Sequence, residues 1–99
     1  YNSKTQCLFD SSKHKPAHTS APSFKNECKV NENAPYVYVC VNETVHGVML
    51  NELPQTKKCP LIADYSSCFF SEPIPWKEYN FGIVYAGAQK NLGPAGLTV

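Results

Sequence analysis

The sequence predicts an α/β fold in which this chain supplies a strand-rich part of a mainly parallel sheet. Its apolar runs are short, apolar throughout and separated by Gly, Pro or polar breakers. Runs without alternation are typical of strands covered on both faces, and such sheets occur in α/β proteins. Hydrophobic residues make up 42% of the chain and charged residues 17%, which favours a globular chain over a disordered one. We therefore expect covering helices, most of them outside this segment.

The first third of the chain is predicted to be a long surface connection. Residues 11–35 are rich in Ser, Lys, Pro, Asn and His and show little periodicity. Pro16, Pro22 and Pro35 interrupt any regular element there. A connection of this length within a domain is usually functional or partly mobile.

Several strands are expected after this connection. The first, residues 36–41, is aromatic and β-branched, a composition typical of strands. The later apolar runs are bounded by breakers such as Gly47, Asp64 and Gly87. The expected strands cover residues 36–41, 48–50, 59–63, 81–86 and, opening at the end of the chain, 97–99.

Charge and hydropathy exclude some classes of function. The formal net charge is +1, so no global field points to nucleic acid or to an anionic membrane. No apolar run approaches the ~18 residues of a membrane span.

The chain begins at Tyr1 without a leader and stops where a strand begins, so we expect an internal segment with both ends truncated.

The cysteines leave two interpretations open. Their number is odd, none form a C-x-x-C pair, and no His completes a zinc pattern, so no metal site is expected. Reduced thiols in a cytosolic protein are the favoured state. The alternative is a secreted interaction module held by disulfides and glycosylated at Asn42, which begins the sequon Asn42-Glu43-Thr44. The five cysteines are Cys7, Cys28, Cys40, Cys59 and Cys68.

Polar residues cluster just after three of the expected strands. The clusters are Asn42-Glu43-Thr44, Asp64-Tyr65-Ser66-Ser67 and Gln89-Lys90-Asn91. In open α/β sheets a ligand binds beyond the carboxyl ends of the strands. We therefore expect the three clusters to converge on one site.

Each cluster holds a side chain with useful chemistry and an ordinary alternative role. Lys90 follows small residues and precedes a Gly-Pro turn. A lysine of lowered pKa forms a Schiff base with an aldehyde, whereas an ordinary lysine is a solvated surface charge. Asp64 is suited to pair with a cationic ring nitrogen, or to cap the N-terminus of a helix, since Ser66 and Ser67 follow it. Thr44 offers a hydroxyl to a phenolic oxygen or to its own turn.

Three ordered blocks resemble the phosphoserine aminotransferases. Residues 81–99, with Tyr85-Ala86-Gly87-Ala88-Gln89-Lys90-Asn91 at their centre, are very similar to the lysine region of that family. Residues 36–47 match it in the same order, and Ala63-Asp64-Tyr65-Ser66-Ser67 falls where the family has Asp-x-Ser-Ser. Residues 1–30 match only loosely.

The resemblance implies a fold-type-I enzyme that uses pyridoxal 5'-phosphate. Lys90 would be the Schiff-base lysine and the base, Asp64 would hold the pyridinium nitrogen, Thr44 would contact the phenolic oxygen, and Gln89 the phosphate. Residues 1–99 would be part of the large cofactor-binding domain, with a variable connection over 1–35 and strands and cofactor motifs over 36–99. The family's reaction interconverts O-phosphoserine and 2-oxoglutarate with 3-phosphohydroxypyruvate and glutamate, in a cytoplasmic homodimer on the route to serine.

Parts of the family's site are not expected in this segment. The ring-stacking Trp lies upstream in the family, and Trp76 is interpreted as a packing aromatic in the Pro73-Ile74-Pro75 connection. The substrate-binding Arg and His positions are also missing, so we expect these residues alone to have no useful transaminase activity. Another aminotransferase of the same fold, or a degenerate gene product that keeps the motif, remains an alternative.

Overall fold

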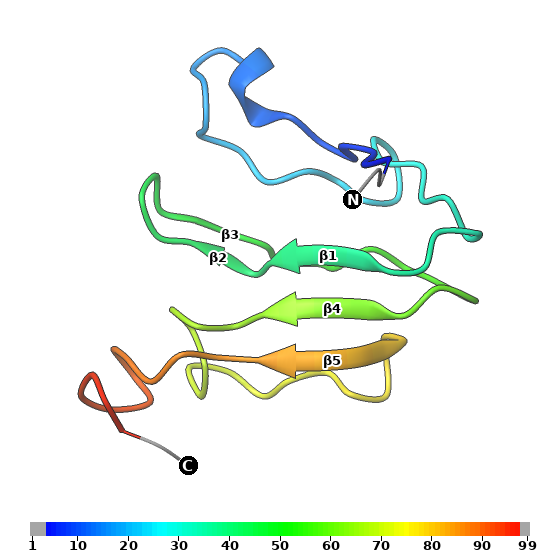
Figure 1. The fold of residues 1–99 in the computed structure, drawn as a ribbon. Helices are drawn as coiled ribbons and strands as arrows, with labels where there is room; N and C mark the ends of the chain where they lie inside the picture. Colours follow the sequence, from blue (N-terminus) through cyan, green and yellow to red (C-terminus); the bar gives the residue numbers. More distant parts are fainter. Residues whose placement is uncertain (1–3, 98–99) are drawn as a thin grey trace.

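The computed structural model describes residues 4–97, and a small parallel sheet lies at its centre (Figure 1). Its elements follow one another without an α-helix among the described residues. In chain order they are the 3-10 turn η1 (Ser11–Lys13) and the strands β1 (Val37–Cys40), β2 (Asn42–Glu43), β3 (Val48–Met49), β4 (Leu61–Asp64) and β5 (Phe81–Tyr85).

The main sheet is parallel and has the strand order β1-β4-β5. β1 and β4 pair in register from Val37 opposite Leu61 to Cys40 opposite Asp64. β4 and β5 pair with a register shift after Leu61 and finish with Asp64 opposite Tyr85. All three strands therefore end at one edge of the sheet (Figure 1), which confirms the predicted parallel sheet.

The expected strand at residues 48–50 forms, but outside the main sheet. β3 pairs antiparallel with β2, Glu43 lying opposite Val48, and the two make a short hairpin beyond the end of β1. Gly47 closes its turn with φ +71°, a left-handed conformation that side chains disfavour. The hairpin extends the chain past the strand ends, towards the predicted site.

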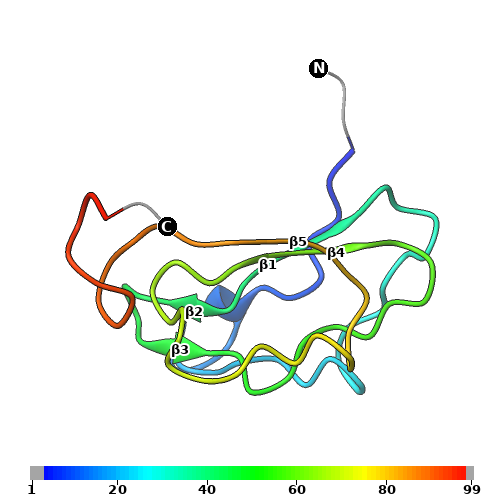
Figure 2. The same cartoon turned by 90° about the horizontal axis from the view of Figure 1, so that it is seen from below.

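Only one face of the sheet is covered within residues 4–97, and the covering helices were predicted to lie mostly outside this segment. Burial alternates along β1 and β4, because successive side chains point to opposite faces. Most connecting segments lie on one side of the sheet (Figure 2). The core on that side comprises Val37, Val39, Val41, Leu53, Cys59, Leu61, Ala63, Tyr65 and Cys68.

The opposite face of the sheet carries large side chains that are about half exposed. Tyr38 and Ile83 are 52% and 54% exposed, and Tyr36 and Tyr85 lie there too. No helix in the part of the chain that the structure describes is long and apolar enough to span a membrane.

The long N-terminal connection is irregular, as predicted, and two carboxylates fasten it. Glu32 accepts hydrogen bonds from the backbone amides of Lys57 and Lys58 at 3.0 and 2.8 Å. Glu52 accepts one from the amide of Phe24 at 2.8 Å. The strand expected at 97–99 is not seen at Leu97, and Thr98 and Val99 lie outside the described residues.

Candidate active site

The strand ends bring three polar side chains abreast on the open face of the sheet. Cys40, Asp64 and Tyr85 are the last residues of β1, β4 and β5, and the register places them side by side. Asp64 stands in the middle because β4 is the central strand. Asp64, a predicted site residue, therefore has the Cys40 thiol on one side and the Tyr85 phenol on the other.

The structure favours the ionised form of Asp64. Burial acts to raise the pKa of its carboxyl, but hydrogen bonds from the side chain and backbone of Ser66, and from Tyr85 and Tyr38, lower it further than burial raises it. The amide of Ser66 donates to Asp64 Oδ1 at 2.8 Å. No helix follows Asp64 in residues 4–97, so the helix-cap interpretation is wrong; the carboxylate caps a turn instead.

Two tyrosines beside Asp64 were not among the candidates from sequence. The hydroxyls of Tyr38 and Tyr85 lie 3.3 Å apart across the open face. This contact, burial and the nearby Asp64 carboxylate raise the pKa of Tyr85, so the Tyr85 phenol stays protonated. The sequence offered one signal for them: Tyr38 lies two residues before Cys40 and so shares its face, and Tyr85 is the last residue of its own strand.

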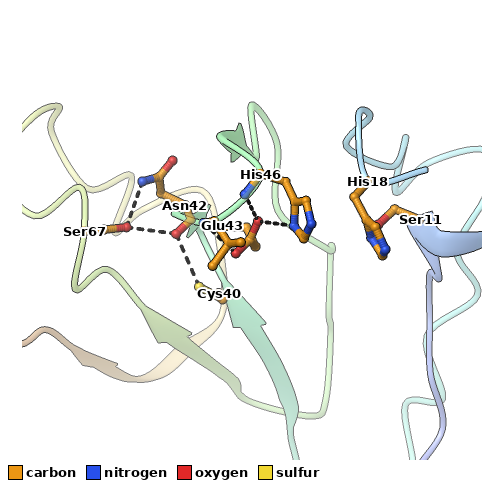
Figure 3. A network of polar contacts seen from close by, with 8 residues as sticks. Ser11, His18, Cys40, Asn42, Glu43, His46 and Ser67 are labelled. Atoms are coloured by element: carbon orange, nitrogen blue, oxygen red, sulfur yellow. Dashed lines mark hydrogen bonds and ion pairs between the residues drawn. The ribbon is translucent and has the colours of Figure 1, made fainter. Parts of the chain in front are cut away.

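The serines after β4 connect the three polar clusters. Ser67 Oγ donates to the carbonyl of Asn42 at 2.8 Å and accepts from Asn42 Nδ2 at 2.7 Å (Figure 3). Ser66 Oγ accepts from the amide of Gly87 at 3.0 Å. The loop after β4 is thus tied both to the hairpin after β1 and to the segment after β5.

Thr44 lies in an exposed turn that its neighbour Glu43 holds in shape. The Glu43 carboxylate accepts from the amides of Val45 and His46 at 2.9 and 2.7 Å and lies 3.0 Å from His46 Nδ1 (Figure 3). The hydrogen bonds from His46 and Val45 lower the pKa of Glu43. The Glu43 side chain therefore fixes the conformation of the turn that carries Thr44.

Gln89 and Lys90 lie in an exposed turn beyond β5. The amide of Leu92 donates to the carbonyl of Gln89 at 3.1 Å, and Lys90 has a left-handed backbone with φ +49°. Such conformations in non-glycine residues cluster at functional sites. Burial raises the pKa of Cys68, and the positive charge of Lys90 acts in the opposite direction.

The structure does not join the predicted side chains to one another directly. Within residues 4–97, no hydrogen bond or ion pair links Lys90 to Asp64, Thr44 or Gln89. What it brings together are the segments that carry them. Trp76 lies elsewhere, with its ring edge-on to Phe81 at 5.5 Å.

The donor set at this edge is suited to pyridoxal 5'-phosphate. It offers an ionised carboxylate, an exposed primary amine, a hydroxyl and an amide, and small residues at 86–88 leave the approach open. A Cβ added at Gly87 would meet only Ser66 Oγ, at 3.8 Å. Among the described residues no group of His, Cys, Asp and Glu is arranged to hold a metal ion.

Comparison with known proteins decides the family. Residues 19–99 match the family model of the class-V aminotransferases. This chain belongs to the class-V aminotransferase family. A phosphoserine aminotransferase from Stenotrophomonas maltophilia is 49% identical over 71 residues, which cover 72% of this chain and 19% of the relative. The chloroplastic phosphoserine aminotransferase 1 of Arabidopsis thaliana is 41% identical over 96 residues, which cover 97% of this chain and 21% of the relative.

Solved structures agree with this assignment and with the fold-type-I sheet. The phosphoserine aminotransferase of Bacillus circulans subsp. alkalophilus matches with a TM-score of 0.71 and 40% identity, over 83% of this chain and 22% of that one. A second structure, from work on radiation damage of the Schiff base in phosphoserine aminotransferase, matches with a TM-score of 0.70 and 41% identity. The class-V aminotransferase chain described here spans about a fifth of the length of these relatives.

All five cysteines lie within the described residues and are free. The alternative of a disulfide-held module is not favoured, because the family match accounts for residues 19–99 and no disulfide contributes to this fold.

Proposed function

We propose that the protein containing this chain is a phosphoserine aminotransferase that depends on pyridoxal 5'-phosphate. It interconverts O-phosphoserine and 2-oxoglutarate with 3-phosphohydroxypyruvate and glutamate. The observation that carries the proposal is the end of the parallel sheet, where an ionised Asp64 lies beside the serines that bind the segments leading to Thr44 and Lys90. The relatives of 40% identity or more bear the same name.

When bound, the cofactor supplies an electron-withdrawing ring that takes up the electron pair released from the substrate Cα–H bond. Asp64 would keep a proton on the ring nitrogen, because an ionised carboxylate favours the cationic partner. Thr44 would donate its hydroxyl to the phenolic oxygen, and Gln89 would bind the phosphate.

Lys90 has two tasks in this proposal. Its Nζ would hold the cofactor covalently and would act as the base that takes and returns the proton of the substrate Cα. Both tasks require a neutral amine during part of the cycle. The exposed, left-handed turn at Lys90 leaves this amine free to approach a ligand.

Borohydride reduction followed by peptide mass mapping tests the proposal. The complete protein is reduced after saturation with pyridoxal 5'-phosphate, and we expect a phosphopyridoxyl adduct confined to Lys90. Lys90→Ala is expected to abolish this adduct and to lower turnover by at least ~1,000-fold, since it removes both nucleophile and base. Lys77→Ala is the matched control, because Lys77 is exposed and precedes β5, whereas Lys90 follows it. Adducts spread over many lysines, or none, would contradict the assignment.

The substrate is tested by comparing amino donors in the complete protein. Phosphoserine is expected to give the highest kcat/KM with 2-oxoglutarate. A preference for a donor without a phosphate group would instead support another aminotransferase of the same fold. The ninety-nine residues alone are expected to show no saturable turnover, and saturable turnover by them would contradict this part of the proposal.

A homodimer and a cytoplasmic location complete the proposal. Both follow from the resemblance to phosphoserine aminotransferases, with small molecules rather than nucleic acid or membrane as partners. A relative from Arabidopsis thaliana is chloroplastic, so the compartment needs its own test by fractionation. Light scattering coupled to gel filtration measures the oligomeric state.

A further inference from the structure

Two adjacent serines form the main polar connection between the three segments of the candidate site. Ser67 reaches Asn42, which is 25 residues earlier in the chain, and Ser66 reaches Gly87, 21 residues later. Both serines lie in the turn that begins at Asp64. They therefore connect chain segments beyond the last backbone hydrogen bonds between the strands, which the amides of Val41 and Tyr65 donate to the carbonyls of Asp64 and Tyr85, both at 2.9 Å.

The hydroxyl of Ser67 makes two contacts with one residue. It donates to the Asn42 carbonyl at 2.8 Å and accepts from the Asn42 side-chain amide at 2.7 Å (Figure 3). A hydroxyl has both a donor and acceptor lone pairs, so both contacts form at once. Asn42 begins β2, and Thr44 follows two residues later, so this pair of contacts sets where the Thr44 turn starts.

The hydroxyl of Ser66 connects Asp64 with the lysine segment. Ser66 Oγ accepts from the amide of Gly87 at 3.0 Å, three residues before Lys90. The same side chain contributes to lowering the pKa of the Asp64 carboxyl. The Ser66 hydroxyl thus favours the ionised form of Asp64 and also holds the backbone that leads to Lys90.

We propose that Ser66 and Ser67 are positioning residues of the cofactor site: Ser67 fixes the segment that carries Thr44, and Ser66 fixes the segment that carries Lys90 relative to Asp64. This inference rests on the proposed function. In the proposed reaction, neither serine touches the reacting atoms. Their task is to hold three chain segments in register, so that side chains with no direct contact in the free protein meet one ligand.

The test uses Ser66→Ala and Ser67→Ala in the complete protein, with Ser71→Ala as the matched control. Ser71 lies in the same loop and its hydroxyl also donates to a backbone carbonyl, that of Cys68 at 2.6 Å, but within residues 4–97 it is hydrogen-bonded to no second segment. Three quantities are measured: the Kd for pyridoxal 5'-phosphate, the pH titration of the bound cofactor's absorbance, and the urea midpoint of the cofactor-free protein.

Each serine variant is expected to weaken cofactor binding by about tenfold, the effect of losing one or two hydrogen bonds. Ser66→Ala should also shift the absorbance titration, because Asp64 loses a donor to its ionised form. Ser71→Ala should leave both the cofactor affinity and the absorbance titration unchanged. Ser67→Thr, which keeps the hydroxyl, should restore most of the affinity even if Ser67→Ala folds poorly.

Cofactor affinity and titration equal to wild type in both alanine variants would overturn the inference. So would losses that follow the urea midpoint across all variants, Ser71→Ala included. The proposed function is judged separately by the adduct at Lys90 in the wild-type protein. An adduct there with unchanged serine variants removes only the positioning role, whereas a wild-type protein without the adduct removes both.

Discussion

Two carboxylates hold irregular segments of the chain in place through hydrogen bonds. Glu32 accepts hydrogen bonds from the backbone amides of Lys57, Lys58 and Cys59, and so ties the long N-terminal connection to the residues that lead into β4. The amides of Lys58 and Lys57 lower the pKa of Glu32, because their hydrogen bonds favour the charged form. Glu43 does the same within the turn that carries Thr44.

The lowered pKa of Glu32 predicts a stability that depends on pH. Its folded pKa lies below the ordinary value of 4.5, so the folded state binds its proton more weakly than the unfolded chain does. The stabilisation is full above that ordinary value and is lost as the pH falls through the folded pKa. Urea midpoints of wild type and Glu32→Gln should therefore differ most at neutral pH and converge in acid.

Glu72→Gln is the control for this experiment, because Glu72 is exposed and accepts no hydrogen bond in residues 4–97. Its midpoint should follow that of wild type at every pH. A gap between Glu32→Gln and wild type that stays constant from neutral pH into acid would show that charge on Glu32 has no part in stability.

Among the elements, β5 depends on a glycine for its close approach to the chain before β4. A Cβ added at Gly82 would lie 2.7 Å from Pro60 Cβ, a distance that real Cβ atoms do not reach. Glycine normally weakens a strand, so its presence here marks this close contact. The register shift between Leu61 and Ile62 lies beside it.

Gly82→Ala is expected to destabilise the fold by ~1–3 kcal/mol, because the proline ring and the strand must shift to admit the methyl group. Gly87→Ala is the matched variant in the segment after β5, where the new Cβ meets only Ser66 Oγ in ordinary contact at 3.8 Å. Chemical unfolding should show a loss for Gly82→Ala and little change for Gly87→Ala. Equal losses would mean that loss of glycine itself, rather than the Pro60 contact, sets the cost.

For the molecule as a whole, stability comes from one buried face of a three-stranded sheet. Leu61 on the central strand is 0% exposed and packs among the core residues of β1 and the covering loops. The long connections cover this face in place of helices (Figure 2). The core is small, so each buried side chain accounts for a large share of the stability.

Leu61→Ala is expected to cost ~2–5 kcal/mol, from lost apolar burial and the cavity left behind. Val45→Ala, in the hairpin turn and 83% exposed, should change stability by less than ~0.5 kcal/mol. Urea unfolding measures both. A cost for Leu61→Ala as small as that for Val45→Ala would contradict the covered face as the source of stability.

Sequence patterns predicted most of the elements but not how they meet. The β-branched run around Val37 and Val39 forms a strand as expected, and Asp64 ends β4 as its place after an apolar run indicated. The run at 48–50 was predicted as a strand, and it pairs with β2 outside the main sheet. The roles of Thr44, Asp64, Gln89 and Lys90 stay predictions, because they depend on a ligand.

The sequence by itself determined the strands, the polar clusters that follow them and the family, since each is encoded in residues close together along the chain. Only the tertiary structure decided that β4 lies between β1 and β5, that Tyr38 and Tyr85 flank Asp64, and that Ser67 reaches Asn42. Periodicity and motifs are local properties, whereas strand order and contacts over 25 residues depend on which faces pack together. That packing is set by the whole core, and no single segment specifies it.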